Sequence, residues 1–199
     1  MNIVFLDIDG VFLSYQPSLL FNQIQYGYDS HVLEAFVTLM ENSTEPSKIV
    51  LVSSKVVQDD PFHWISDATL TTRFRKLLHP EMPSIKIKYI HEDRYLGIID
   101  WLKEYGTYVN RSVVIEDSLK EYLNREEPIE SSDFYLIPCR NAYGMRWPEL
   151  KLLDYILKPT LTKMQKQFIE NYLSYGFSHG ANEELEVFWK KHMSKLYKL

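Results

Sequence analysis

Cysteine is almost missing from the sequence, since Cys139 is the only one among 199 residues. A single cysteine cannot form a disulfide within the chain, which fits a reducing compartment. Long apolar runs are missing as well, and none reaches the length that spans a bilayer. The N-terminus has neither the basic segment nor the cleavage site of a secretory signal. We therefore expect a soluble, cytoplasmic protein that has no membrane partner.

Positive charge is also in short supply, with 22 Lys and Arg against 27 Asp and Glu and a net charge of −5. Such a chain exerts no broad attraction on nucleic acid or on an anionic membrane, so a nucleic-acid partner is disfavoured. The composition is 45% hydrophobic and 25% charged, as is usual for a globular protein. The length suits one domain with a sizeable core and an appendage.

Short apolar runs alternate with helical patterns along most of the chain. The five runs are residues 2–6, 48–53, 85–90, 112–116 and 133–138. They suit strands that are buried on both faces. Helical patterns cover residues 31–42, with Ser30 as N-cap, and residues 95–105. This alternation predicts an α/β fold with right-handed crossovers, a Rossmann-like three-layer sandwich around a five-stranded parallel sheet.

The alternation stops near Pro159, and two amphipathic helical patterns follow at residues 161–172 and 185–196. We therefore divide the chain into a sheet domain, residues 1–158, and a C-terminal helical extension, residues 159–199. The extension either packs on the core or binds a protein partner.

Two aspartates, Asp7 and Asp9, follow the first predicted strand directly. In an open parallel sheet, ligands bind beyond the carboxyl ends of the strands. Neighbouring carboxylates repel each other unless they share a cation, and oxygen ligands of this kind suit Mg²⁺. An Asp-x-Asp-Gly sequence can also be a simple turn. The apolar strand before it favours a magnesium site.

Two more strand ends carry polar groups. The second strand ends at Ser53 and is followed by Ser54 and Lys55, and these groups can hydrogen-bond and neutralise a phosphate. The fourth strand ends in Glu116 and Asp117. Because the carboxyl ends of parallel strands meet at one edge of a sheet, we expect these groups to form one site.

These motifs, in this order, resemble those of the haloacid dehalogenase (HAD) superfamily: DIDGV at 7–11, SS at 53–54 and IEDS at 115–118. The resemblance covers about residues 1–158. A closer similarity is to small capless members, including the HAD domain of Swiss-army-knife RNA repair proteins. It is carried by RYLGIIDWL at 94–102, by IEDS and by NAYGM at 141–145. Those proteins usually have Trp-Arg after the serines, where this chain has Lys55-Val56.

The resemblance implies a Mg²⁺-dependent phosphatase that acts through an aspartyl-phosphate. It makes Asp7 the nucleophile and Asp9 the general acid–base. Mg²⁺ would be held by the Asp7 and Asp117 carboxylates and the backbone carbonyl of Asp9, with help from Glu116. Ser53 would hydrogen-bond a phosphoryl oxygen.

The family also has a basic residue that neutralises the phosphate, at the start of the helix before the fourth strand. Arg94 holds that position here, and arginine can contact phosphate bidentately. Lys88 and Lys55 remain alternatives. Ser54 and Lys55 complete the predicted phosphate-binding group.

Other reactive side chains are discounted. His63, His79 and His91 lack the spacing of metal ligands, and we interpret them as surface or loop residues. Cys139 has no paired base in the sequence, and we interpret it as a packing residue.

Neither residues 12–48 nor residues 56–84 leave room for a separate cap domain, so we expect an open site, with residues 13–28 as an alternative partial lid. An open site favours a phosphorylated, macromolecular substrate. One alternative is a non-catalytic HAD-like binding module that works through the C-terminal helices, although the intact aspartates argue against it. Another is a polynucleotide-end phosphatase, for which the chain lacks a basic stripe.

Overall fold

The computed structural model describes residues 1–17, 24–53, 62–85, 94–117, 133–139, 144–165 and 167–168, and the account below concerns these residues. In chain order the elements are β1 (Asn2–Leu6), β2 (Ser14–Pro17), β3 (Ile24–Gly27), α1 (Ser30–Glu41), β4 (Ser47–Leu51), α2 (Ala68–Leu77), α3 (Arg94–Tyr105), η3 (Gly106–Tyr108), β5 (Arg111–Glu116), β6 (Asp133–Pro138) and α5 (Trp147–Ile156).

Four strands form a parallel sheet in the order β4-β1-β5-β6. The apolar runs predicted at 2–6 and 133–138 are strands with those bounds, β5 begins one residue early, and β4 covers Ser47–Leu51 rather than 48–53. The chain leaves β1 for β4 on one side and pairs β5 on the other, so β1 lies at a topological switch point. A ligand site is expected beyond its carboxyl end.

The fifth strand, predicted at 85–90, lies outside the described residues except for Ile85, and it stays a prediction. The described chain reaches the outer side of β4 just before it. Ser84 forms an isolated parallel bridge with Leu51, and the Leu51 amide donates a hydrogen bond to the Pro83 carbonyl at 2.8 Å. Residues 83–84 therefore run beside β4 in the direction that a fifth parallel strand requires.

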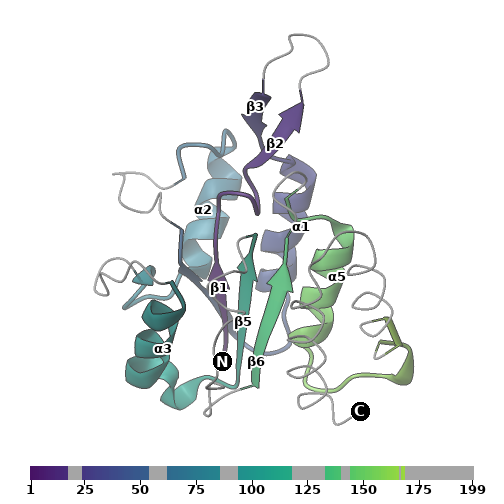
Figure 1. Cartoon of the computed structure of the whole chain (residues 1–199). Helices are drawn as coiled ribbons and strands as arrows, with labels where there is room; N and C mark the ends of the chain where they lie inside the picture. Colours follow the sequence, from purple (N-terminus) through teal and green to yellow (C-terminus); the bar gives the residue numbers. More distant parts are fainter. Residues whose placement is uncertain are drawn as a thin grey trace.

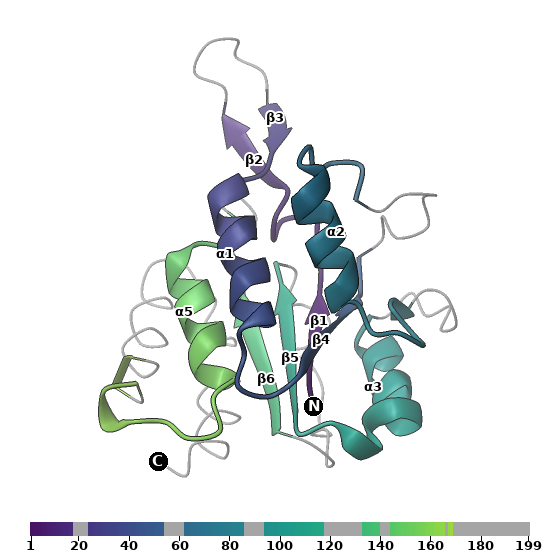
Figure 2. The same ribbon diagram turned by 180° about the vertical axis from the view of Figure 1, so that it is seen from behind.

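Helices cover both faces of the sheet. α1 lies between α2 and α5 on one face, and α3 covers the other (Figures 1 and 2). α3 buries Trp101 against Phe5 of β1, with the ring centroids 5.3 Å apart. On the other face, Phe36 of α1 contacts Phe74 of α2. β1 is buried along its whole length, which explains its uninterrupted apolar sequence.

α1 has a different N-cap from the predicted one. The cap is Asp29, whose carboxylate accepts hydrogen bonds from the amides of His31 at 2.9 Å and Val32 at 3.2 Å. The prediction of Ser30 was wrong by one residue, because Asp29 has the extended backbone of a cap and Ser30 already lies in the helix. The second predicted helix, α3, begins at Arg94 rather than Tyr95.

β2 and β3 form an antiparallel hairpin that projects beyond the carboxyl end of β1 (Figure 1). It lies within residues 13–28, which were predicted to supply a partial lid. Most of the C-terminal extension lies outside the described residues, so the division at 158–159 stays a prediction. Among the helices of the described residues, none is long and apolar enough to cross a membrane.

Candidate active site

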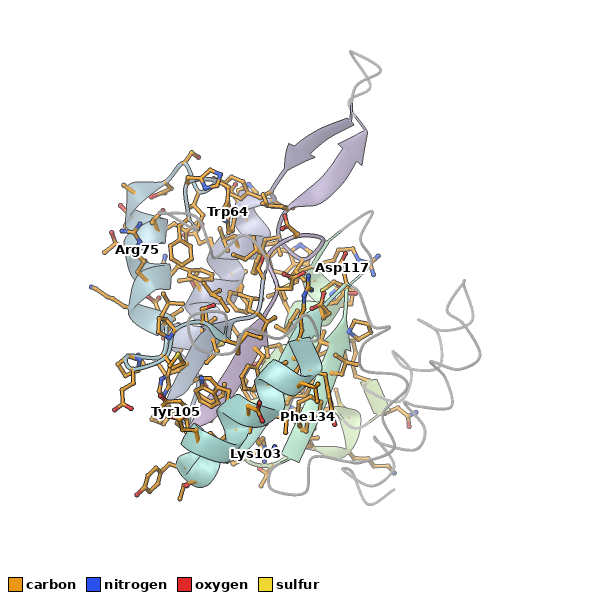
Figure 3. The ribbon with its side chains drawn as sticks, turned by 60° about the vertical axis from the view of Figure 1, so that its left-hand side comes forward. Trp64, Arg75, Lys103, Tyr105, Asp117 and Phe134 are labelled. Carbon is orange, nitrogen blue, oxygen red and sulfur yellow. The ribbon has the colours of Figure 1, made fainter. Side chains whose placement is uncertain are left out.

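Acidic side chains from two neighbouring strands meet at the carboxyl edge of the sheet. Asp7 follows β1, Glu116 is the last residue of β5, and Asp117 comes next. Each offers a carboxylate oxygen within 4.8 Å of those of the other two. The amide of Asp7 donates to the carbonyl of Ile115 at 3.0 Å, which fixes the two strand ends side by side. Figure 3 shows Asp117 on the side of the molecule from which the hairpin projects.

Arg94, the first residue of α3, links two of these acids. Its Nη1 lies 2.7 Å from Glu116 Oε2 and 3.2 Å from Asp7 Oδ2. The side chain of Arg94 is 22% exposed, whereas those of Asp7 and Glu116 are 1% and 0% exposed. Arg94 therefore lies between two buried carboxyls and the solvent.

Burial has the largest effect on the pKa values of Asp7 and Glu116. It raises the pKa of Asp7, and the positive charge of Arg94 opposes this. Burial, together with the charge of Asp7, raises the pKa of Glu116 to about 9, again against the effect of Arg94. Two buried carboxyls beside one arginine cannot both be charged at low cost. Without a cation, burial therefore favours the neutral form of Glu116.

The loop after Asp7 depends on a glycine. Gly10 has a φ of +76°, a conformation that L side chains rarely adopt. A Cβ atom built on Gly10 would lie 2.0 Å from Asp117 Oδ2. The glycine of the Asp-x-Asp-Gly motif is thus required twice, for the backbone turn and for the close approach of Asp117.

The remaining predicted residues fall into two groups. Ser53 is fully buried just past β4, and Asp9 is half-buried in the loop after β1. The amide of Val52 donates to the carbonyl of Leu6 at 2.9 Å, so β4 is held beside β1 up to the residue before Ser53. Ser54, Lys55 and Lys88 lie outside the described residues.

The cysteine and the histidines that were discounted as site residues differ in their surroundings. Cys139 is buried, and burial raises the pKa of its thiol, as expected of a packing residue. His63 is exposed, as predicted, and His91 lies outside the described residues. His79 lies in a loop, as one of the two predicted alternatives had it, but it is not a surface residue. It is 6% exposed, its Nδ1 accepts a hydrogen bond from the Met82 amide, and its ring lies against Trp101.

A segment near the site was not predicted. The amide of Met145 donates to the carbonyl of Val11 at 2.6 Å, which brings the start of α5 beside the Asp-x-Asp-Gly loop. The buried carboxylate of Glu149 then accepts hydrogen bonds from the backbone amide of Arg146 at 3.0 Å and from its guanidinium at 2.9 Å. The sequence did contain a signal for this helix, because a proline in its first turn is followed at once by a glutamate, the residue that accepts from the N-cap amide.

Comparison with known proteins agrees with this geometry. The family model described as "HAD domain in Swiss Army Knife RNA repair proteins" matches residues 3–150. The matched range holds the four strands of the parallel sheet, the hairpin and all four residues of the Asp7–Arg94–Glu116–Asp117 cluster. No curated protein and no solved structure matches the chain. Since the family model covers well over half of the sequence, the chain belongs to this family of HAD domains.

Proposed function

We propose that this protein is a Mg²⁺-dependent phosphomonoester hydrolase that acts through an aspartyl-phosphate on Asp7. The observation that carries the proposal is the cluster of Asp7, Glu116 and Asp117, within 4.8 Å of one another and beside Arg94. Membership in the HAD family supports a hydrolase of the phosphatase type.

The chemistry of the cluster fits a magnesium ion. Asp7 Oδ1 is buried and has no hydrogen-bond partner among the described residues, while Oδ2 faces Arg94. A buried carboxylate oxygen without a partner is costly, and a hard cation offsets that cost. Asp7, Asp117 and the backbone carbonyl of Asp9 would hold the ion, assisted by Glu116. When bound, it offsets the repulsion between Asp7 and the substrate and stabilises charge in the transition state.

In the proposed reaction, Asp7 acts as the nucleophile and Asp9 as the general acid and base, in two steps. A carboxylate oxygen of Asp7 attacks phosphorus as the bond to the leaving oxygen breaks, and Asp9 gives that oxygen its proton. Asp9 next takes a proton from water, whose oxygen attacks the phosphorus of the aspartyl-phosphate. The bond to Asp7 breaks, inorganic phosphate leaves, and both aspartates return to their starting state.

The basic and hydroxyl groups around the acidic cluster would bind the phosphate of the substrate. Arg94 would exchange part of its contact with Asp7 and Glu116 for the phosphate, which its partly exposed position allows. Ser53 would donate a hydrogen bond to a phosphoryl oxygen, with Ser54 and Lys55 completing the phosphate site. Because the sequence leaves no room for a separate cap, we propose a macromolecular phosphate ester as the substrate.

A second candidate is a polynucleotide-end phosphatase, which the description of the family favours. The net charge of −5 argues for weak contacts to a nucleic-acid backbone. Hydrolysis of a phosphorylated oligonucleotide that falls steeply with salt, with no hydrolysis of phosphopeptides, would select this candidate.

The first test is hydrolysis of an aryl phosphate by the full chain, with Mg²⁺ and with a chelator. We expect turnover only with Mg²⁺, and its loss in Asp7→Asn, because an amide is a poor nucleophile toward phosphorus. The matched control is Asp100→Asn, which removes a carboxylate of α3 that pairs with Lys103 away from the site. Equal turnover in Asp7→Asn and the parent chain would overturn the nucleophile assignment.

A further inference from the structure

A groove runs between α1 and α5, on the face of the sheet seen in Figure 2. Its volume is about 670 Å³. It extends from His31 and Trp147, at the N-termini of the two helices, to Asn42 and Leu157 just past their C-termini. The groove is therefore about as long as the helices that form it, on the order of 15–18 Å.

The lining of the groove combines apolar and acidic groups. Ala35 and Leu39 of α1 contribute the apolar part, and Trp147 of α5 lies at one end with 62% of its surface exposed. A large aromatic side chain that exposed, beside an apolar groove, is typical of a surface that binds another segment. Glu34 of α1 adds negative charge, whereas Asp154 of α5 is paired with Lys158, which also lines the groove and has its Nζ 2.6 Å from Asp154 Oδ2.

The described chain ends on α5, the helix that forms one wall of this groove. Phe168 packs edge-on against Tyr155 of α5, with the ring centroids 5.4 Å apart, and Lys151 Nζ lies 5.3 Å from the Phe168 ring centre. Tyr155 and Lys151 do not line the groove, but they belong to the same helix, so residues 169–199 continue from α5. The residues between 168 and 182 can span far more than the width of one helix.

The C-terminal sequence has the complementary pattern. Apolar and aromatic side chains recur on one face of a predicted helix over residues 185–196, at 185, 188, 189, 192 and 196. Lysines stand at 190, 191, 195 and 198, outside that stripe, and glutamates stand at 183, 184 and 186, so the positive charge is confined to the C-terminal part of the segment. Twelve helical residues measure about 18 Å, which matches the length of the groove.

We propose that residues 182–199 dock as an amphipathic helix in the groove between α1 and α5 of the same chain. The apolar stripe would cover Ala35, Leu39 and Trp147, and the lysines would lie near Glu34 and Asp154. This is helix-in-groove recognition, and the covalent link gives the segment a high effective concentration. The docking does not depend on the reaction at Asp7, because the groove shares no residue with the acidic cluster.

Zero-length carbodiimide coupling of the full chain, read by mass spectrometry, tests the contact. It joins only carboxylates and amines that touch, so we expect links from Glu34 or Asp154 to lysines of residues 190–198. The native pair Asp100–Lys103, with Oδ1 and Nζ 3.1 Å apart, is the internal positive control. Links from those lysines to Asp100 as often as to Glu34 would overturn the proposal. So would links found only between ¹⁵N-labelled and unlabelled copies in a mixture, which would place the helix on a second chain.

A pair of full-length variants tests the groove itself. Trp147→Ser removes an exposed anchor, and Tyr108→Ser is the matched control, since Tyr108 is 77% exposed and does not line the groove. Native-state trypsin cleavage after Lys190, Lys191 and Lys195 reports the undocked fraction. We expect cleavage to be about tenfold faster in Trp147→Ser, because the variant loses one aromatic contact that docking would bury. We expect no change of the cleavage rate in Tyr108→Ser. Equal rates in the two variants would contradict docking at this groove.

Discussion

At the scale of single residues, the position of the Asp117 carboxylate, which we propose as a metal ligand, depends on a neighbour that has no side chain. Gly10→Ala would place a methyl group 2.0 Å from Asp117 Oδ2 and would add about 1 kcal/mol of backbone strain at positive φ. Asp117 must move, so we expect weaker Mg²⁺ activation and a lower turnover. Titration of the turnover with Mg²⁺ measures both. The control is Gly106→Ala, where the nearest atom to the new methyl is 3.6 Å away. Identical Mg²⁺ responses in the two variants would remove the steric argument.

His79 gives a second prediction at this scale. Burial lowers its pKa below the ordinary value of 6.5, so the unfolded chain binds a proton there more readily than the folded chain. Stability should therefore be fully present above about pH 6.5 and should be lost as the pH falls below it. Urea unfolding of the parent chain and of His79→Asn at about pH 8 and about pH 5.5 measures this. Asparagine keeps an acceptor for the Met82 amide but does not titrate, so the variant should lose less stability on acidification. Equal losses would mean that other groups set the acid sensitivity.

At the scale of elements, α1 joins the hairpin to the core, and its first turn depends on Asp29. Asp29→Ala removes the acceptor for two amides and should lower the free energy of unfolding by about 1 kcal/mol. Ser30→Ala is the matched control, since this residue lies inside the helix and is exposed, and we expect a change within about 0.5 kcal/mol. Urea denaturation of both variants measures the difference. A larger effect of Ser30→Ala would restore Ser30 as the cap.

Elements were predictable where burial on both faces imposed a continuous apolar sequence. β1 and β6 have the predicted bounds for that reason, and parallel pairing then brought Asp7 beside Glu116. The β2–β3 hairpin was foreseen only as a flap, because its strands lie outside the main sheet and lack that apolar pattern. The burial of His79 was missed because it depends on Trp101, a contact between distant parts of the chain. The role of Arg94 as a link between two acids likewise required the folded geometry.

At the scale of the whole molecule, the acidic cluster is a source of instability that a cation would relieve. Asp7, Glu116 and Asp117 converge on one side of Arg94, and Asp7 Oδ1 is buried without a hydrogen-bond partner among the described residues. Like charges held close together raise the free energy of the folded state, and function can require that cost. A ligand that binds only the folded state then stabilises it by mass action, by about 2.7 kcal/mol at a concentration of 100 times Kd.

Asp117→Asn removes one repelling carboxylate and one proposed metal ligand, so its effects with and without Mg²⁺ should have opposite signs. With a chelator present, we expect the variant to be about 0.5–2 kcal/mol more stable than the parent chain. With saturating Mg²⁺, we expect the order to reverse, since only the parent chain gains the binding energy. Thermal unfolding of both proteins under both conditions measures this. Asp100→Asn, which breaks an exposed pair with Lys103, should instead keep the full response to Mg²⁺. An Asp117→Asn variant that is less stable with the chelator and equally responsive to Mg²⁺ would show that Asp117 supports the fold rather than the metal site.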